Sequence, residues 1–571
     1  MGSFKRHVKR PDLNQLIYGG LIAVVAVTVV YPFVMLLIRS FTGGVSGDGL
    51  SLIHMITRRQ ILKSLLHTFL VSLSVTSATL AIGGSLAWLV VRTDIPGKVL
   101  IERLVLITFM IPAYILGVSW LELFGRNGYV SRFLMSTIGY GGYDLQYYSL
   151  TAVAVVLSVH LYPLVFLALK SAFQQHDRSL ENAAVVSGAS ALQSFRYITL
   201  PLVMPSVASI GLFVFSRSMA NFSVPALLAL PARKEVLTTH IFSALSALRL
   251  QEATILSLLL VILSGSVYLF YRTLQSRTNC VTSSREAKEP KIYNMKNKRW
   301  PVFFLVLLFQ SFTTILPLIA IILSSLLKRW GLPLSWEYFT LNNYKVLLFN
   351  QDFSTISFRS AFMNSAGYGI IAATGAVLIA SLTLYSTYQK RHMRSRVLVA
   401  LTTWPMAFPN IVLAIAAILA WNRWPIRLYG TPWVIIITYF VLFIPICMKQ
   451  MSGLIERIDP TMMHAARIYG ASPIRAFFSV ILATILPGAK NGWLLCFLIA
   501  LREIPIALML YSSGQETLGV LLFGMQSQSY GLEMTSTLAV VIIVCTMGGH
   551  SIIQKSKRSI RYVPIDTSSS E

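Results

Sequence analysis

Residues 177–190 read Asp-Arg-Ser-Leu-Glu-Asn-Ala-Ala-Val-Val-Ser-Gly-Ala-Ser, and residues 459–472 read Asp-Pro-Thr-Met-Met-His-Ala-Ala-Arg-Ile-Tyr-Gly-Ala-Ser. The displacement from Asp177 to Asp459 is the same as that from Phe195 to Phe477 downstream. Both stretches are polar interruptions of a very hydrophobic chain. A polar segment that recurs in this way predicts two structurally similar halves, each with the same loop.

The stretch 177–205 is predicted to form a helix–turn–helix. Asp177 can accept hydrogen bonds from the first free N–H groups of a short helix. Gly188 ends that helix where a turn needs a residue without a Cβ atom. A second short amphipathic helix follows, with Phe195 on its apolar side. The stretch 459–487 repeats this pattern, with Asp459, Pro460, Gly470 and Phe477.

The composition indicates a membrane protein that crosses the bilayer many times. Of the 571 residues, 55% are hydrophobic and 12% are charged, and the mean hydropathy is +0.67. The net charge of +27 is scattered between hydrophobic runs, as positive-inside topology requires, so we expect no nucleic-acid partner. The four cysteines form no Cys-x-x-Cys pair, and no metal site or bound cofactor is predicted. The chain has no P-loop motif and no recognisable catalytic constellation, so we expect it not to be an enzyme.

Twelve hydrophobic runs are long enough to span a bilayer. They lie near residues 16–38, 64–91, 104–124, 149–169, 203–222, 253–271, 302–326, 362–385, 399–420, 432–450, 489–510 and 536–553. The first run is too long for a signal peptide and is expected to be retained. The excess of Lys and Arg between alternate runs places both termini in the cytoplasm of a multi-pass protein of the cell inner (plasma) membrane.

We therefore predict an all-α polytopic membrane protein of two parallel pseudo-symmetric halves with six helices each. The halves are expected at residues 1–272 and 301–554. A basic cytoplasmic linker at residues 273–300 joins them, and a cytoplasmic tail occupies residues 555–571. A transport pathway is expected between such repeats.

Landmarks outside the loops support the repeat. Thr68 corresponds to Ser365, and Pro112, in the third run, corresponds to Pro409, in the ninth, at the same displacement. The number of residues that separates these landmarks from their counterparts is slightly larger than the number that separates the two loops. The difference arises because one segment outside the membrane is longer in the first half than in the second.

Ionisable residues at membrane depth are candidates for the pathway. Arg217 and the pair Arg502-Glu503 lie within predicted membrane helices, where a charge is costly unless it faces water or a partner. Glu503 corresponds to Asn221 at the displacement of the loops, so Asn221, Glu503 and Arg217 are the candidate pathway residues. The alternative is that Glu503 turns away from the pathway and pairs with Arg502 or Arg217. Glu122 is expected at the membrane interface.

The repeated loops resemble the EAA motif, Glu-Ala-Ala-x3-Gly-x9-Ile-x-Leu-Pro, of binding-protein-dependent ABC importer permeases. The matching residues are Ala183, Ala184, Gly188, Leu200 and Pro201 in the first copy and Ala465, Ala466, Gly470 and Leu482 in the second. Asn182 and His464 stand where the family has Glu, although Glu181 is adjacent, and Ala483 replaces the final proline of the second copy.

The whole chain resembles a fused type I ABC importer permease of this family. Stretches at residues 91–98, 221–228 and 501–508 are most similar to ferric-iron permeases. The resemblance implies two ATPase subunits that bind ATP and Mg²⁺, an extracytoplasmic substrate-binding protein and a lipid bilayer as partners. The residues implied in ATPase docking are Glu181, Asn182, Ala183, Ala184, Gly188, Ala189, His464, Ala465, Ala466, Gly470 and Ala471.

Other transport functions remain open at this point. Related permeases for thiamine, 2-aminoethylphosphonate and polyamines share the architecture. A secondary transporter driven by an ion gradient is also built from repeats, but it would need several carboxylates at mid-membrane. Only Glu503 is expected that deep, so the ABC importer interpretation is favoured.

Overall fold

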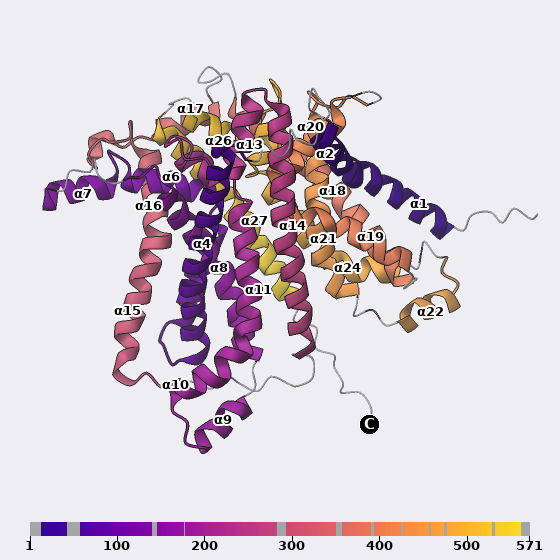
Figure 1. Cartoon of the computed structure of the whole chain (residues 1–571), viewed down its shortest axis with the longest axis horizontal. Helices are drawn as coiled ribbons and strands as arrows, with labels where there is room; N and C mark the ends of the chain where they lie inside the picture. The colour runs from indigo at the N-terminus through magenta and orange to yellow at the C-terminus, as the bar shows by residue number, and fades with distance from the viewer. Residues whose placement is uncertain are drawn as a thin grey trace, which may run out of the picture. The chain divides into compact units, whose positions relative to one another are not determined.

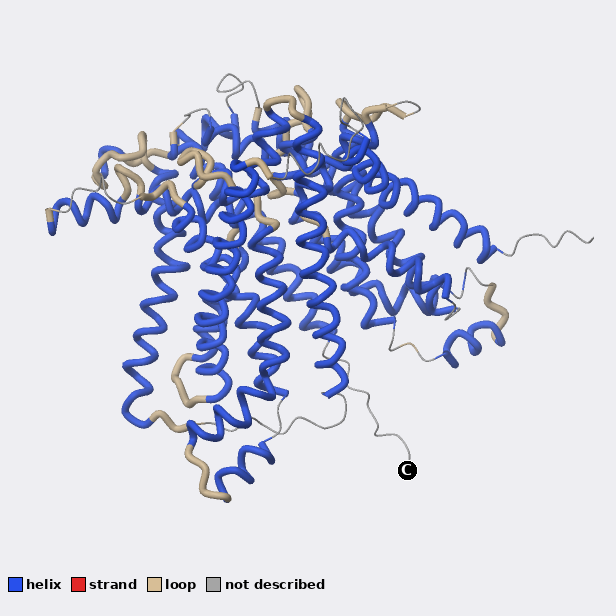
Figure 2. Tube along the Cα trace, viewed as in Figure 1, coloured by secondary structure: helices blue, strands red, loops and turns tan. Residues whose placement is uncertain are grey.

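The computed structural model of the chain is almost entirely helical (Figure 2). It describes residues 13–42, 57–139, 146–175, 178–281, 293–349, 357–389, 393–423, 426–455, 458, 460–472, 475, 477–527 and 531–560. Within these ranges the only β-type pairings are three isolated bridges and no strand is present. The predicted all-α fold class is confirmed.

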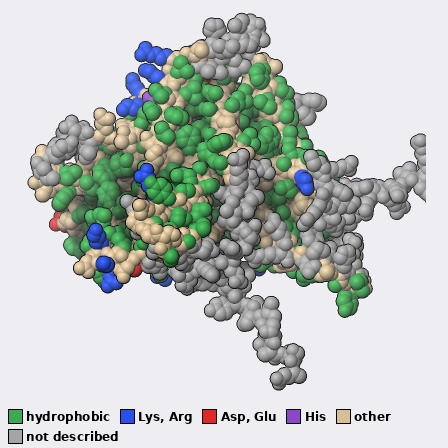
Figure 3. Space-filling view, turned by 60° about the horizontal axis from the view of Figure 1, so that its bottom comes forward, with side chains coloured by type: hydrophobic (Ala, Val, Ile, Leu, Met, Phe, Trp, Pro, Cys, Tyr) green, Lys and Arg blue, Asp and Glu red, His purple; other side chains and the backbone are tan. Residues whose placement is uncertain are grey.

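Ten helices in the described ranges are long and apolar enough to cross a membrane. They are Tyr18–Thr42, Arg59–Arg92, Leu150–Gln175, Phe195–Met219, Leu250–Tyr271, Lys296–Leu326, Phe358–Thr387, Pro432–Ile455, Phe478–Ala500 and Leu532–Ile552. Apolar side chains cover much of the face seen in Figure 3, as a surface in contact with lipid requires.

Two further predicted spans are sharply bent rather than straight. Helix α5 (Lys98–Met110) meets the helical segment Ala113–Thr137 at 99°, and Ser395–Ala407 meets α20 (Asn410–Trp421) at 112°. With each bent pair taken as one span, the described total is the predicted twelve. The runs predicted near 104–124 and 399–420 are therefore present, each divided by a sharp bend. Both bends follow a proline, Pro112 or Pro409, which cannot donate a helical hydrogen bond and disfavours helix in the residue before it.

The eleventh run also differs from its predicted extent. Its long helix α24 (Ala483–Ala500) ends well before the predicted boundary at 510. A short turn follows, and then a separate helix α25 (Pro505–Leu510). Pro505 at the start of α25 explains the interruption. The predicted linker at 273–300 begins as helix, because α14 (Leu250–Val281) continues into it.

The chain forms two compact units, each described here by itself. Unit 1 comprises Met1–Arg39, Arg359–Gly519 and Cys545–Glu571. Unit 2 comprises Ser40–Phe358 and Val520–Val544. The units cut across the sequence halves, because the first helical segment of each half belongs to the unit formed mainly by the other half.

Unit 2 is built around four long helices: α4 (Arg59–Arg92), α8 (Leu150–Gln175) and α11 (Leu200–Met219) pack against one another, and α14 packs on α11. Figure 1 shows α9 (Arg178–Val186) and α10 (Ala191–Ser194) beyond one end of them, and α13 (Leu237–Ser246) near the other end. The helices α15 (Arg299–Gln310) and α16 (Leu316–Leu326) pack on α5 and α6 (Ala113–Phe124). The α6 residue Glu122 lies near the end of its helix, is fully buried in the protein and accepts a hydrogen bond from Ser536; its expected place at the membrane interface stays a prediction.

Unit 1 repeats several of these elements. Helices α21 (Pro432–Ile455) and α24 pack along each other, and α20 packs on α25. Helix α22 (Pro460–Ile468) follows α21 and is the counterpart of α9 (Figure 1). The N-terminal helix α2 (Tyr31–Thr42) stacks Phe33 on Phe408, with ring centroids 3.9 Å apart. The N-terminal segment is thus fixed against the break at Pro409.

The two halves correspond in hydrogen bonding as well as in order. His67 on α4 bonds through Nδ1 to the carbonyl oxygen of Glu235 at 2.9 Å. Asn364 on α18 (Phe358–Gln389) donates from Nδ2 to the carbonyl oxygen of Glu516 at 3.0 Å. His67 and Asn364 immediately precede the corresponding residues Thr68 and Ser365, so they are equivalent in the repeat. This correspondence supports the predicted pseudo-symmetric repeat.

Candidate functional site

The first repeated loop forms the predicted first helix and turn. The second helix is not separate, because helical structure continues from Ala191 through Pro201 into the membrane helix α11. Helix α9 ends in a turn where the Ala189 N–H donates to the Ala184 carbonyl oxygen at 2.9 Å. Gly188 has φ +86°, the left-handed conformation expected of a glycine that ends a helix. The next helical segment is capped reciprocally: the Ser190 N–H donates to Gln193 Oε1 at 2.8 Å, and the Gln193 N–H donates to Ser190 Oγ at 3.3 Å.

The second loop has the same backbone geometry at the corresponding residues. The Ala471 N–H donates to the Ala466 carbonyl oxygen at 3.0 Å, and Gly470 has φ +79°. The Arg475 N–H donates to Ser472 Oγ at 3.3 Å, which corresponds to the cap at Ser190 in the first loop. Pro460 is the first residue of α22, as predicted.

Four predicted loop residues cannot be placed in full. Asp177 and Asp459, the predicted helix caps, lie outside the described residues. The side chains of Asn182 and His464, which occupy the Glu position of the EAA motif, are likewise not described, although both residues lie within helices. Their predicted docking role stays a prediction.

Both loops carry apolar side chains that face away from the protein. In the first loop Leu180 is 53% and Val186 is 89% exposed; their counterparts Met462 and Ile468 are 49% and 83% exposed. The small residues of the motif, Ala183 and Ala465, are exposed beside them. These exposed apolar groups make each loop a candidate surface for contact with another protein.

Glu181 does not share that exposed surface. Its side chain is buried and accepts hydrogen bonds from Arg92 Nη1 at 3.1 Å and from Thr199 Oγ1 at 2.8 Å. The sequence analysis did not identify Arg92 or Thr199 as part of the loop. The only sequence signal for Arg92 is its place at the end of a membrane run, a position where basic residues are common.

Asn221 and Glu503 occupy equivalent positions next to short helices. Asn221 Oδ1 accepts the N–H of Val224 at 3.1 Å, at the start of α12 (Ser223–Leu228). The Glu503 carboxylate accepts the Ile506 N–H at 3.0 Å, in the first turn of α25. Val224 and Ile506 each lie three positions after the capping residue, so the predicted correspondence is confirmed in geometry.

Glu503 acts as a buried cap at the N-terminus of α25. Its carboxylate also accepts hydrogen bonds from the Ala507 N–H at 3.1 Å and from Asn410 Nδ2 at 3.2 Å, and the residue is 4% exposed. The sequence analysis did not identify Asn410, which begins α20 directly after the break at Pro409. Carboxylates are favourable at a helix N-terminus, where unpaired N–H groups point outward. Whether Glu503 also lines a pathway stays a prediction.

Arg217, the third candidate pathway residue, lies near the end of α11. Its guanidinium carbon is 5.4 Å from the centroid of the Phe213 ring, one helical turn earlier. A cation over an aromatic face is attracted by the ring quadrupole. This contact holds the Arg217 side chain along its own helix, and its assignment to the pathway stays a prediction.

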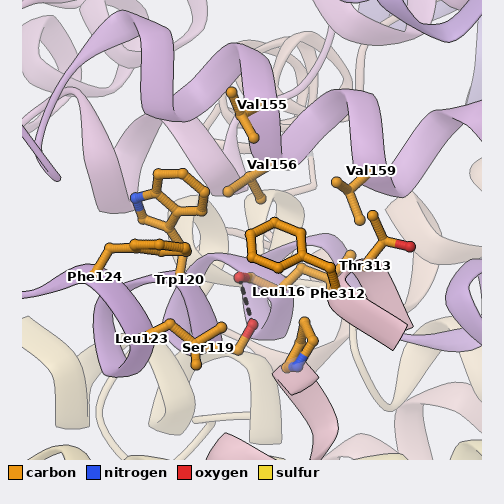
Figure 4. A pocket seen from close by; sticks show the side chains of 11 residues that line it. Leu116, Ser119, Trp120, Leu123, Phe124, Val155, Val156, Val159, Phe312 and Thr313 are labelled. Atoms are coloured by element: carbon orange, nitrogen blue, oxygen red, sulfur yellow. Dashed lines mark hydrogen bonds between the residues drawn. The ribbon is translucent and has the colours of Figure 1, made fainter. Parts of the chain in front are cut away.

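The pocket in Figure 4 does not resemble a site for a charged substrate. It has a volume of about 40 Å³ and contains no charged side chain and none of the predicted site residues. Its walls are Leu116, Ser119, Trp120, Leu123, Phe124, Val155, Val156, Val159, Phe312, Thr313 and Pro317. No group of three or more metal-ligating side chains occurs among the described residues.

A family model matches the chain twice. It describes the binding-protein-dependent transport system inner membrane component, and it matches residues 80–279 and 376–559. The two matches together cover more than half of the chain, and each includes one of the repeated loops.

Named proteins are similar over most of the chain. The ferric transport system permease protein FbpB of Actinobacillus pleuropneumoniae is 23% identical over 541 residues, which cover 93% of this chain and 77% of that protein. The Fe(3+)-transport system permease protein FbpB 2 of Haemophilus influenzae is 24% identical, over 88% of this chain and 90% of its own length. The sulfate transport system permease protein CysT of Salmonella typhimurium is 27% identical over 39% of this chain.

Proposed function

Because the chain belongs to the family of binding-protein-dependent transport system inner membrane components, we propose that its two repeated loops dock two ATPase subunits, one on each loop. The chain is then the permease through which an ATP-driven importer moves its substrate into the cytoplasm. The loops and both termini lie on the cytoplasmic side in this proposal, as the distribution of Lys and Arg favours.

The observation that carries the proposal is the shared geometry of the two loops. Each presents a short helix, a glycine with positive φ and two exposed apolar side chains, all at one constant displacement along the chain. Two equal surfaces on one chain suit two copies of the same partner. We therefore define residues 177–205 as coupling loop 1 and residues 459–487 as coupling loop 2.

ATP and Mg²⁺ belong to the partner in this proposal, since the chain has no P-loop motif. An extracytoplasmic binding protein delivers the substrate on the opposite side of the membrane. Coupling loop movements driven by ATP binding would then be passed to the membrane helices that each loop joins, α8 and α11 for loop 1 and α21 and α24 for loop 2.

Ferric iron is the substrate that we propose. The similar proteins that cover 85% or more of this chain are named as ferric transport permeases, whereas the sulfate permease covers less than half of it. The sequence stretches at 91–98, 221–228 and 501–508 resemble ferric-iron permeases and support the same choice.

Transport by reconstituted protein tests this function. The chain would be placed in liposomes with a P-loop ATPase and an extracytoplasmic binding protein from the same organism, and radiolabelled ferric iron would be supplied on the binding protein. Uptake that requires ATP, the binding protein and ferric iron is expected. ATP-dependent uptake of sulfate or a polyamine without uptake of iron would overturn the substrate, and uptake driven by an ion gradient alone would overturn the ABC importer.

A further inference from the structure

Coupling loop 1 is attached to α4 by a buried ion pair. Arg92, the last residue of α4, donates from Nη1 to Glu181 Oε2 on α9 at 3.1 Å. The Arg92 side chain is 0% exposed and that of Glu181 is 3% exposed. Since α4 is a membrane-spanning helix and α9 carries the exposed docking surface, this pair joins two elements that are 89 residues apart in sequence.

Two further contacts attach the second part of the same loop to α4. Thr199, at the end of the helical segment Phe195–Thr199, donates from Oγ1 to the other oxygen of Glu181 at 2.8 Å. The Phe195 ring lies edge-on to the ring of Trp88, one turn before Arg92, with centroids 6.1 Å apart. Glu181 is therefore held from both sides, and both helical segments of the loop contact the end of α4.

Tyr293, a described residue of the linker between the halves, covers this cluster. Tyr293 donates its backbone N–H to the Arg92 carbonyl oxygen at 2.7 Å and accepts the Asp94 N–H at 3.3 Å. Its ring stacks on Trp88 with centroids 6.1 Å apart. Burial, and secondarily the charge of Glu181, raises the pKa of the Tyr293 phenol, so this cover is uncharged at neutral pH. Tyr293 thus lies against the ion pair through both its backbone and its ring.

The ion pair is poorly suited to stabilise the fold by itself. Among the described residues, Arg92 Nε and Nη2 are buried without a hydrogen-bond acceptor. A buried ion pair with unsatisfied donors contributes little net stability, because desolvation offsets the attraction. Such a pair does restrict geometry, because any displacement of α9 would separate two buried charges.

Coupling loop 2 lacks the residues for an equivalent cluster. At the corresponding positions Met463 replaces Glu181, Gln389 replaces Arg92 and Ile481 replaces Thr199. Ile481 is fully buried, and the side chains of the other two are not described. Methionine and isoleucine cannot form an ion pair or donate a hydroxyl hydrogen bond, so Met463 and Ile481 cannot reproduce the contacts of Glu181 and Thr199.

We propose that Arg92 and Glu181 are positioning residues that fix coupling loop 1 to α4, with Tyr293 of the linker as their cover. Loop 1 is then the stiff loop, whose displacement is transmitted directly to α4, and loop 2 is the more compliant one. The transmission rests on the proposed function, because it assumes that an ATPase moves the loop. The stiffness itself does not depend on that function and can be measured on the chain alone.

Spin labels on the two loops measure this stiffness. The exposed residues Val186 and Ile468 occupy corresponding positions on α9 and α22, so V186C and I468C report matched sites. The four native cysteines would be replaced and the full chain reconstituted in liposomes without ATPase. We expect the label at V186C to be less mobile than that at I468C. E181Q should raise the mobility of V186C about threefold, toward that of I468C, because a neutral amide holds Arg92 less tightly.

Three variants separate positioning from a general loss of structure. The exchange R92E/E181R restores opposite charges and should return V186C to low mobility. Y293A should raise the mobility while leaving the ion pair intact. E102Q removes the half-exposed pair between Lys170 and Glu102, 2.7 Å apart in the same unit, and should leave the label unchanged. If E181Q does not accumulate, T199V replaces it, with a smaller rise expected.

The outcomes distinguish this proposal from the proposed function. Equal mobility of V186C and I468C in the otherwise unmodified chain, or no change with E181Q, would overturn the attachment of loop 1. Co-purification of ATPase is measured in parallel on chains with the same substitutions but with native Val186 and Ile468, so that no label lies on the docking surface. A stiff loop 1 in a chain that binds no ATPase would leave the attachment standing and refute docking. ATPase binding by a chain with two equally mobile loops would support docking and refute the attachment of loop 1.

Discussion

The hydroxyl of Thr68 accepts the backbone N–H of Leu237 at 2.8 Å, and so fixes the start of α13 to the side of α4. The same relationship recurs in the second half, where Ser365 Oγ accepts the N–H of Leu518 at 2.8 Å at the start of α26 (Leu518–Ser527). A hydroxyl on a long membrane helix thus satisfies a free helix N–H in each half. The repeat therefore preserves single hydrogen bonds even where the residue type has changed.

Removal of these hydroxyls should destabilise the protein. In T68V and S365A the N–H of Leu237 or Leu518 stays buried without this acceptor, which costs about 1–3 kcal/mol. We expect a lower thermal unfolding midpoint of the purified chain, measured by intrinsic fluorescence. T76V is the matched control, because the Thr76 hydroxyl donates to the Ser72 carbonyl oxygen of its own helix. An equal effect of T76V and T68V would contradict the assigned role of Thr68.

The glycines of the coupling loops should be sensitive to backbone strain rather than to crowding. An added Cβ at Gly188 or Gly470 would meet no atom within 4 Å, but both residues have positive φ. A side chain there costs about 1 kcal/mol or more. We therefore predict that G188D and G470D both reduce transport, unequally, while the chain still inserts into the membrane.

Asparagine variants provide the control, since asparagine tolerates the left-handed conformation better than other residues. G188N and G470N should retain more transport and bind more ATPase than the aspartate variants. Normal transport and ATPase binding by both G188D and G470D would show that these loops do not dock the partner.

Glu503 should be required for stability. In E503Q the amide can no longer offer two anionic oxygens to the N–H groups of Ile506 and Ala507, so the cap on α25 weakens by about 1 kcal/mol. We expect less E503Q in the membrane and a lower unfolding midpoint. N221A, which removes the neutral cap on Val224 in the first half, should have a smaller effect.

Uptake per molecule distinguishes the structural role of Glu503 from a role in the pathway. Unchanged uptake per remaining E503Q molecule would indicate a cap only. Reduced uptake at normal abundance would indicate that the carboxylate faces the substrate. Normal abundance together with normal uptake would contradict both roles.

The sequence was sufficient for features that depend on local chemistry or on repetition. The positive φ of Gly188 and Gly470 follows from helix termination by glycine, and the equivalence of Asn221 and Glu503 follows from a constant displacement. Hydropathy could not reveal the bends after Pro112 and Pro409, because the residues on both sides are apolar and the hydrophobic run continues through the turn.

Polar contacts between residues far apart in the chain could not be predicted from the sequence. Arg92 resembles any basic residue at the end of a membrane helix, and only the fold shows that Glu181 lies against it. Asn410 likewise appeared to be one polar residue in an apolar run, and the contact with Glu503 depends on the bend before it. The same holds for the thiols of Cys447 and Cys496, which have no sequence motif but lie 3.6 Å apart between α21 and α24.

The number of ATPase subunits bound to one chain tests the central claim most directly. The chain would be purified with an excess of its ATPase and the intact complex weighed by native mass spectrometry, with V186D and I468D as variants that each place a charge on one exposed docking surface. We predict two ATPase subunits for each unmodified chain and one for each single variant. A saturated complex with one ATPase or none, or two ATPase subunits on the V186D/I468D double variant, would contradict the assignment of the two loops.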